Sequence, residues 1–407
     1  MDLSCRYARG LALPHPLLAA SAGTTESVER LARAEEAGLA GAVMKTLFED
    51  PVARRDPAPM FALLEHNAGR VRSSTFYCHE QASHRDPQAY GEEIRRAKEQ
   101  VGIAVIGSIA CMTDEAWAEY ARVVEQAGAD ALELNLSCPF SVHLTDKLDA
   151  LPRFVTHVIE LVCEAVRLPV AAKLTPQMSS PTQIARLMEQ AGADAVVPFS
   201  RFPGLDVDVE AEAPVMHGGM AGHGGPWALY YVLGWIAHLF GQVSVPISGS
   251  GGVWTAEDAV KHLLVGADTV QLCTVLYLQG YEAATAALQG LQEWMAGKGY
   301  TSLDQFRGQA ARRLLAMHQV VRRQEVVAQV GERCTGCGLC ARICLHQAIR
   351  TEGERTYRVV AEECTGCGLC VDPCPAGAMA LVALPPGYRP RHDVARYYDV
   401  LTGEPYS

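Results

Sequence analysis

The sequence predicts an α/β protein in which a (β/α)8 barrel is followed by a small cysteine-rich module. Three observations lead to this prediction. Across residues 1–300, short and nearly continuous apolar runs alternate with stretches of helical length, as expected of parallel strands that are covered by helices. A glycine that ends a helix shortly before a strand recurs in this region. Nearer the carboxyl end, cysteines occur in two copies of one spacing.

The barrel is predicted from the number of candidate strands. An open doubly wound sheet is the alternative, but eight strand-and-helix units favour a barrel. The candidate strands are residues 16–21, 41–46, 103–109, 131–137, 169–175, 195–200, 245–250 and 269–274.

Four of the expected helices end in the same way. In segments such as EQAGADA a glycine stands between the helix and the next strand, at Gly38, Gly128, Gly192 and Gly266. Glycine adopts the left-handed conformation at no steric cost, so the helix stops there and the chain reverses.

The rest of the chain divides by composition. Residues 280–325 have the pattern of further helices, and the last residues are rich in proline and glycine. We therefore expect a barrel at 1–300, a helical linker at 301–330, the cysteine-rich module at 331–383 and an irregular tail at 384–407.

Composition limits the classes of partner. The chain has 407 residues, 49% of them hydrophobic, which is enough for one large core and a small one. The net charge is −11 and no basic block is present, so we expect neither nucleic acid nor membrane as a partner. No segment is apolar over about 18 residues and no leader precedes the barrel, which predicts a soluble protein.

The cysteine-rich module carries the most specific motif of the chain. Its two runs, CTGCGLCARIC and CTGCGLCVDPCP, share the spacing C-x2-C-x2-C-x3-C. This is the run of bacterial two-cluster ferredoxins, in which the fourth cysteine of each run ligates the other 4Fe-4S cluster. Structural zinc and disulfides are the alternatives, but zinc sites use pairs of cysteines and leave the fourth ones unexplained. We assign one cluster to Cys334, Cys337, Cys340 and Cys374, and the other to Cys364, Cys367, Cys370 and Cys344.

The remaining cysteines show no pairing pattern. They are scattered along the barrel region, and reduced thiols together with iron–sulfur clusters indicate the cytoplasm.

Barrel enzymes carry their chemistry at the carboxyl ends of the strands. The seventh and eighth candidate strands end in SGSGGV and QLCT, and glycine-rich turns at these positions commonly hold a phosphate. Because the clusters carry single electrons, a phosphorylated flavin is the cofactor that suits this site.

Polar residues follow three other candidate strands. Asn135 lies beyond the apolar run of the fourth and Cys138 follows that strand, while Lys45 and Lys173 lie at the ends of the second and fifth within apolar surroundings. A buried lysine needs an acceptor, and the flavin region that gains negative charge on reduction would supply one. The alternatives are lysines that reach the barrel rim and a cysteine that serves as a small core residue.

These residues support a resemblance to a known family. ELNLSCP, AAKLTP and SGSGGV, together with the cysteine runs, resemble the dihydroorotate dehydrogenase family. Within it they are most similar to the flavin and iron–sulfur subunits of bacterial dihydropyrimidine dehydrogenases. The resemblance implies FMN, with Lys173 near N1 and O2, Lys45 at the flavin or substrate, Asn135 at the substrate and Cys138 on a mobile loop. The cofactor-binding residues that it implies are Ala20, Ser21, Gly23, Lys45, Thr46, Asn135, Lys173, Ser200, Gly224, Gly225, Gly251, Gly252, Cys273 and Thr274.

The implied reaction is hydrogen transfer at a CH–CH or C=C bond next to a carbonyl. FMN N5 would exchange the hydride, and Cys138 would exchange the proton from the other face. A thiol with a pKa of about 8.5 is mostly protonated at neutral pH and suits this role. His143 or Asp146 could share it.

The sequence departs from the family at the expected substrate pocket. Asparagines that read a pyrimidine ring are replaced by Cys78 and Phe199, and Arg72, Arg201 or His143 could meet an anionic or carbonyl group. Losing amide readers from a hydrogen-bonding pocket costs orders of magnitude in recognition.

Three functions stay open at this point. The first is an oxidoreductase for a substrate poorer in amides than uracil, the second is reduction of uracil or thymine, and the third is a flavin and iron–sulfur electron carrier without catalysis. Since the chain shows no second dinucleotide fold, an NAD(P)H/FAD-type partner subunit is expected. The resemblance leaves a homodimer possible.

Overall fold

The computed structural model describes residues 1–50, 59–68, 71–78, 83–137, 150–176, 178, 180–215, 221–316, 319 and 326–384. The side chains of 66–68, 71–74 and 77 also lie outside the description. The chain forms two compact units, Met1–Leu314 and Leu315–Ser407.

Eight parallel strands form the centre of the first unit, as the sequence predicts. Their hydrogen-bonded order is β11-β10-β9-β8-β4-β3-β17-β16, and a parallel bridge between Val196 and Ile247 joins the two ends of this order. A short strand, β5 (Leu47–Phe48), pairs with β8 outside the path. The eight strands are β3 (Leu17–Ala19), β4 (Gly41–Val43), β8 (Ala104–Ala110), β9 (Ala131–Asn135), β10 (Val170–Lys173), β11 (Ala195–Val197), β16 (Ser248–Ser250) and β17 (Thr269–Leu272).

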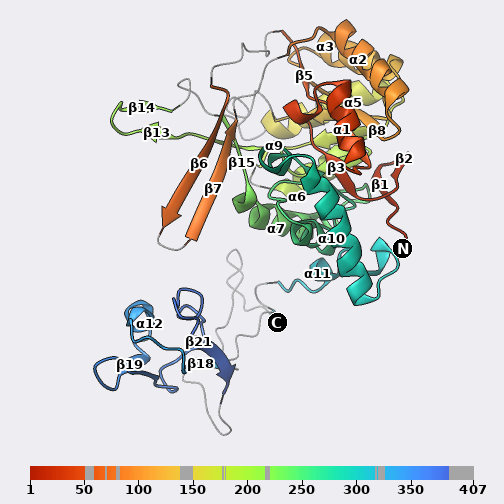
Figure 1. The fold of residues 1–407 in the computed structure, drawn as a ribbon. Coiled ribbons are helices and arrows are strands. Elements are labelled where there is room, and N and C mark those ends of the chain that lie inside the picture. The colour runs from red at the N-terminus through yellow and green to blue at the C-terminus, as the bar shows by residue number, and fades with distance from the viewer. Residues whose placement is uncertain are drawn as a thin grey trace, which may run out of the picture. The chain divides into compact units, whose positions relative to one another are not determined.

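Helices surround these strands (Figure 1). Their apolar faces and the outward faces of the strands make one large core, the usual arrangement of a barrel. The predicted helix ends are confirmed, because Gly38, Gly128, Gly192 and Gly266 all have positive φ. The helices of the first unit are α1 (Val28–Glu36), α2 (Pro87–Gln100), α3 (Asp114–Gln126), α5 (Ala150–Ala165), α6 (Pro181–Gln190), α7 (Leu229–Leu239), α8 (Ala256–Leu264), α9 (Thr274–Gln279), α10 (Glu282–Lys298) and α11 (Gln309–Arg312), with 3-10 turns at Gly23–Thr25, Pro226–Ala228 and Leu303–Gln305.

An antiparallel hairpin at the start of the chain packs into the barrel. It consists of β1 (Cys5–Ala8) and β2 (Leu11–Leu13). Tyr7 and Leu13 of this hairpin share a buried cluster with strand residues such as Leu18 and Ile106. The hairpin therefore fills the barrel interior below the layer of polar residues described in the next section.

A second, antiparallel sheet stands beside the barrel strands. Its order is β12-β15-β7-β6, and the long β6–β7 hairpin projects from the barrel in Figure 1. The glycine-rich stretch around residue 222, which the sequence suggests to be a turn, is strand β15 of this sheet. The strands are β6 (Phe61–Ala68), β7 (Val71–Cys78), β12 (Phe202–Gly204) and β15 (Ala221–Gly224), and a separate ribbon is formed by β13 (Val207–Asp208) and β14 (Ala213–Pro214).

The predicted helical linker at 301–330 is helical only in part. A 3-10 turn and the short α11 occupy 303–312, and these residues belong to the first unit. Residues 326–330 form strand β18 instead, because they pair in an antiparallel register with residues 379–383 of the second unit.

The second unit is small and built from two hairpin-like pairs. Strand β18 (Val326–Val330) pairs with β21 (Met379–Ala383), and β19 (Ile349–Thr351) pairs with β20 (Tyr357–Val359). One short helix, α12 (Leu339–Ile343), carries the third cysteine of the first run. Cys340 and Cys370 lie in the apolar core of this unit.

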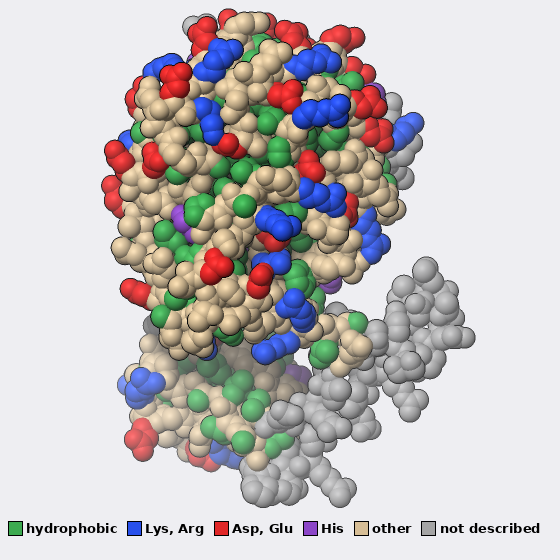
Figure 2. Space-filling model, turned by 90° about the vertical axis from the view of Figure 1, so that its right-hand side faces the viewer, with side chains coloured by type: hydrophobic (Ala, Val, Ile, Leu, Met, Phe, Trp, Pro, Cys, Tyr) green, Lys and Arg blue, Asp and Glu red, His purple; other side chains and the backbone are tan. Residues whose placement is uncertain are grey.

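Charged side chains of both signs share the face of the barrel unit that Figure 2 shows, where acidic and basic groups are interspersed. Within the part of the chain that the structure describes, every helix is too short or too polar to cross a membrane.

Candidate functional site

A cavity of about 1100 Å³, including its open mouth, lies at the carboxyl ends of the barrel strands. The antiparallel sheet lines one side of it through Phe76, Cys78, Phe202 and His223. Most of the predicted cofactor and substrate residues lie in the cavity walls, that is Ala20, Ser21, Lys45, Thr46, Asn135, Lys173, Ser200, Gly224, Gly225, Gly251, Gly252, Cys273, Thr274, Cys78, Phe199 and Arg201, whereas Gly23 does not.

Alternation along the strands explains which residues reach the cavity. In β9, Ala131 belongs to the apolar cluster inside the barrel, and every second residue of a strand faces the same side. Glu133 and Asn135 therefore face the barrel interior like Ala131, each one layer closer to the carboxyl end of the strand. Both line the cavity.

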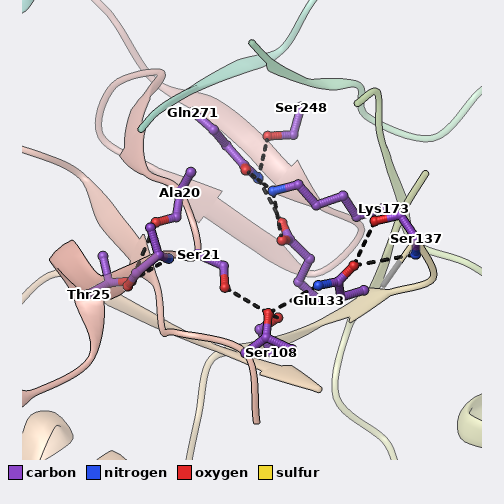
Figure 3. A network of polar contacts seen from close by, with 12 residues as sticks. Ala20, Ser21, Thr25, Ser108, Glu133, Ser137, Lys173, Ser248 and Gln271 are labelled. Atoms are coloured by element: carbon purple, nitrogen blue, oxygen red, sulfur yellow. Dashed lines mark hydrogen bonds and ion pairs between the residues drawn. The ribbon is translucent and has the colours of Figure 1, made fainter. Parts of the chain in front are cut away.

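Glu133 is the centre of a buried polar network inside the barrel (Figure 3). Lys173 Nζ donates to Glu133 Oε1 at 3.1 Å and to Gln271 Oε1 at 2.8 Å. Gln271 Nε2 and the Tyr7 hydroxyl donate to Glu133 Oε2 at 2.8 and 2.9 Å, and Gln271 Nε2 also reaches Ser248 Oγ at 3.3 Å. Burial and then the Glu133 carboxylate raise the pKa of Tyr7 well above its usual value, so this hydroxyl remains a donor.

The network changes one expectation from the sequence. Lys173 is buried, with 7% of its side chain exposed, so it does not extend to the barrel rim. Its acceptors within the protein are Glu133 and Gln271, which the sequence analysis did not name beside the expected flavin. The sequence did contain a signal for Glu133, since it stands two positions before Asn135 in a strand, and reading only strand ends missed it.

A second network fixes Asn135. Its Oδ1 accepts from Ser137 Oγ at 2.8 Å, and its Nδ2 points toward Thr46 Oγ1 at 3.4 Å. Thr46 in turn lies 2.9 Å from Ser21 Oγ and 2.8 Å from Ser108 Oγ. The amide is thus oriented from both ends before any ligand binds.

Lys45 lies at the outer edge of this part of the cavity. Its Nζ is 3.5 Å from Glu26 Oε2, and 12% of its side chain is exposed. The lysine is therefore less buried than Lys173 and its carboxylate partner is more exposed.

Glycines form tight turns on the opposite side of the cavity. Gly225, Gly251 and Gly252 have positive φ. A Cβ at Gly224 would lie 2.8 Å from Thr274 Oγ1, and one at Gly252 would lie 2.4 Å from the backbone nitrogen of Leu229. Gly224 and Gly252 therefore have no room for a side chain, and their backbone lines the cavity.

The outer wall is apolar with a cationic group. Phe199 is 1% exposed and lies 5.7 Å, ring to ring, from Tyr231. Arg201 Nη1 reaches the carbonyl oxygen of Cys78 at 3.5 Å. A Cβ at Gly222 would lie 2.7 Å from Arg201 Nε, so the glycine makes room for the arginine.

His223 is the remaining titratable group of this wall. Burial lowers its pKa below 6.5, and the nearby Asp206 opposes the shift only in part. The ring is therefore neutral at neutral pH.

Some predicted residues lie outside the described part of the chain. They are Cys138, His143 and Asp146, and the side chain of Arg72.

In the second unit, cysteines from both runs surround one small cavity. Cys334, Cys337 and Cys340 line it together with Cys374 of the other run. Backbone N–H groups approach the sulfurs, with Ala378 donating to Cys374 Sγ at 3.2 Å and Ala328 to Cys364 Sγ at 3.3 Å. Desolvation opposes ionisation of Cys374, but the backbone donors around it lower its pKa overall.

Disulfide bonds and single metal-ion sites are the two alternative uses of the cysteines. No described cysteine forms a disulfide bond. Among the described residues, no three His, Cys, Asp or Glu side chains make a group of the size that holds one metal ion.

A parallel barrel with a polar cavity at its strand ends, in a chain that also carries a two-run cysteine unit, defines a class of iron–sulfur oxidoreductases. Comparison with known proteins agrees. The family model for dihydroorotate dehydrogenase matches residues 79–295, and that for a 4Fe-4S dicluster domain matches residues 328–381. The chain belongs to the dihydroorotate dehydrogenase family, and it is an oxidoreductase with an iron–sulfur domain.

Individual relatives resemble the chain over different lengths. The catalytic subunit of dihydroorotate dehydrogenase B (NAD(+)) from Pyrococcus abyssi is 30% identical over 303 residues, which cover 74% of this chain and 97% of the relative. The NAD-dependent dihydropyrimidine dehydrogenase subunit PreA of Escherichia coli K12 is 30% identical over 398 residues, covering 93% of this chain and 95% of the relative. The second similarity therefore includes the cysteine-rich unit.

Proposed function

We propose that this protein is an FMN- and iron–sulfur-dependent oxidoreductase that acts on a CH–CH or C=C bond adjacent to a carbonyl. The observation that carries the proposal is the cavity at the strand ends. Its lining combines glycines with fixed amide and lysine donors, in a chain that also has a 4Fe-4S dicluster domain.

The residues around the cavity fit FMN. Gly224 at the end of strand β15 and Gly252 after strand β16 leave backbone where side chains would collide, and such bare backbone is typical of phosphate sites. With Cys273 and Thr274 they would hold the phosphate. Ala20, Ser21, Gly23, Thr46, Lys173 and Ser200 would surround the rest of the cofactor.

FMN, when bound, exchanges a hydride with the substrate and single electrons with the clusters. The side chains of this protein would do the rest. Asn135, fixed by Ser137 and Thr46, would bind the substrate carbonyl. Lys45 would neutralise charge at the substrate edge, and Cys138 would give or take the proton, with His143 or Asp146 as further candidates.

The substrate is proposed to be poorer in amides than uracil. Phe199 presents an apolar wall and Cys78 a thiol where amide readers are expected for a pyrimidine, while Arg201 offers guanidinium donors beside them. An isolated carbonyl or carboxylate on an apolar conjugated frame would satisfy this set, whereas the amide edges of uracil would lose hydrogen bonds on entering it.

The clusters would relay electrons between FMN and a partner. The shared cavity of Cys334, Cys337, Cys340 and Cys374 supports the assignment in which the fourth cysteines are exchanged, with Cys364, Cys367, Cys370 and Cys344 holding the other cluster. Two relatives are named as subunits of NAD-dependent enzymes, which supports an NAD(P)H/FAD-type partner subunit here.

A second function, the reduction of uracil or thymine, is favoured by one observation. The similarity to the E. coli dihydropyrimidine dehydrogenase subunit covers 93% of this chain, including the cluster-binding unit.

Anaerobic turnover with a reduced dye tests both functions. The purified protein is first checked for FMN and iron, and then offered uracil, thymine and a set of conjugated carbonyl compounds with and without a carboxylate. We expect turnover of an amide-free compound, and we expect Arg201→Gln to raise KM most for those bearing a carboxylate. Efficient uracil reduction with no turnover of the amide-free set supports the second function, and the absence of bound FMN rules out both.

A further inference from the structure

The buried ion pair under the cavity is unusual for a barrel interior. The side chains of Glu133 and Lys173 are 0% and 7% exposed, in layers that barrels normally fill with branched apolar residues. A buried pair of this kind is often no more stabilising than an apolar pair of the same size. Stability alone therefore gives little reason for its presence.

The contacts fix the carboxylate rigidly. Three donors, from Lys173, Gln271 and Tyr7, converge on its two oxygens at 2.8 to 3.1 Å. Because an ionised carboxylate only accepts hydrogen bonds, this donor set matches it. The lysine is also held, since Nζ is shared between Glu133 and Gln271.

The charges lining the cavity make this carboxylate distinctive. Among the described lining residues the cations are Lys45, Lys173 and Arg201, and Glu133 is the one carboxylate. Lys45 faces Glu26 at 3.5 Å, outside the lining. Glu133 is therefore the group that opposes the positive field of Lys173 within the cavity.

We propose that the negative charge of Glu133, held against Lys173, lowers the reduction potential of FMN bound in the cavity. This rests on the proposed function, in which Lys173 lies beside the flavin. Reduction adds negative charge to the flavin, which Lys173 favours. The carboxylate fixes the ammonium group in place and offsets part of its charge, so the reduced cofactor is held less tightly than it would be with lysine alone.

Reduction potentials of charge variants test the proposal. The potential of bound FMN relative to free FMN reports the ratio of affinities for the reduced and oxidised forms, and spectroelectrochemical titration measures it. Glu133→Gln keeps the shape of the side chain and an acceptor oxygen but removes the charge. We expect this ratio to rise tenfold or more, a rise in potential of about 30 mV for a two-electron couple. A smaller rise, no change or a fall overturns the proposal.

Two further variants separate charge from packing. Lys173→Met disturbs the same network but should move the ratio in the opposite direction, whereas a merely structural role would move both alike. Tyr7→Phe removes a donor to Glu133 without changing a charge, and the ratio should change less than threefold. A shift with Tyr7→Phe as large as that with Glu133→Gln also overturns the proposal.

Folding and cofactor loading are controlled separately. If Glu133→Gln does not fold, Lys173→Met is compared with the double variant of Lys173→Met and Glu133→Gln, in which neither residue of the pair is charged. The affinity ratio should be tenfold higher in the double variant. A smaller difference overturns the proposal. If the wild-type protein binds no FMN, the proposed function fails. If FMN binds and its potential ignores Glu133, only the present inference fails.

Discussion

Replacing Lys173 by methionine should destabilise the barrel strongly because it leaves Glu133 charged and unpaired. The two groups are 3.1 Å apart and nearly inaccessible to solvent. At an effective dielectric constant of about 20, their attraction is about 5 kcal/mol. Breaking a buried pair from one side costs about 3–5 kcal/mol, and the lost contact to Gln271 adds to this. We expect a loss of about 3–5 kcal/mol in the free energy of unfolding.

Urea unfolding followed by tryptophan fluorescence measures this loss. The five tryptophans, Trp117, Trp227, Trp235, Trp254 and Trp294, all lie in the barrel unit, so the signal reports on that unit.

The matched control is Lys45→Met. Its pair with Glu26 is longer, at 3.5 Å, and 29% of the Glu26 side chain is exposed, so a loss of about 1 kcal/mol or less is expected. The double variant of Lys173→Met with Glu133→Gln should recover part of the stability. Equal losses for the two lysine variants, or no recovery in the double variant, would refute the reasoning.

Three other predictions concern separate parts of the molecule. His262 is fully buried without a hydrogen-bond partner among the described residues, and burial lowers its pKa from 6.5 to about 4. Between these two pH values the unfolded chain binds the proton more readily than the folded protein does. The free energy of unfolding should therefore be at its full value above pH 6.5 and fall by about 3 kcal/mol as the pH drops to 4. Urea unfolding across this range should show a weaker pH dependence of this free energy for His262→Leu. Gly252→Ala places a Cβ 2.4 Å from the backbone of Leu229 at a φ of +78°. The affinity for FMN, measured by fluorescence titration, should therefore fall tenfold or more. Gly234→Ala is the control, because a Cβ there has nothing within 4 Å, and it should leave the affinity unchanged. The double variant Cys334→Ser with Cys374→Ser should lose only half of the iron, because both residues serve one cluster; loss of all iron in a colorimetric assay would show that the fourth cysteines are not exchanged.

The barrel could be predicted because its strands carry their own signal. A parallel strand buried on both faces is an apolar run, and all eight candidate runs overlap a strand of the barrel. The helix ends at Gly38 and Gly128 could be predicted for the same reason, because a positive φ depends mainly on the residue type at that position.

The antiparallel sheet could not be predicted in this way. Strand β15 contains Gly222 and Gly224, which suggest a turn when read alone. They form a strand because β7 and β12 pair with them on either side, and Gly222 gives space to the Arg201 side chain. This is information about tertiary neighbours and not about local propensity.

The candidate site was predictable in its residues but not in its charges. Strand ends pointed to Lys173 and Asn135, and both line the cavity. The partners of Lys173 come from β9 and β17, which are distant in the sequence, so pairing with Glu133 and Gln271 becomes evident only when the barrel closes.

The hydrogen bond between Tyr7 and Glu133 joins residues that are 126 positions apart. One of them belongs to the first hairpin of the chain, and the other lies directly beneath the cavity. A shortened hairpin near the amino terminus would therefore remove a donor to Glu133 in the cavity wall, although no residue of the hairpin is among the described residues that line the cavity. The opening residues of this polypeptide thus form part of the inner support of the candidate site.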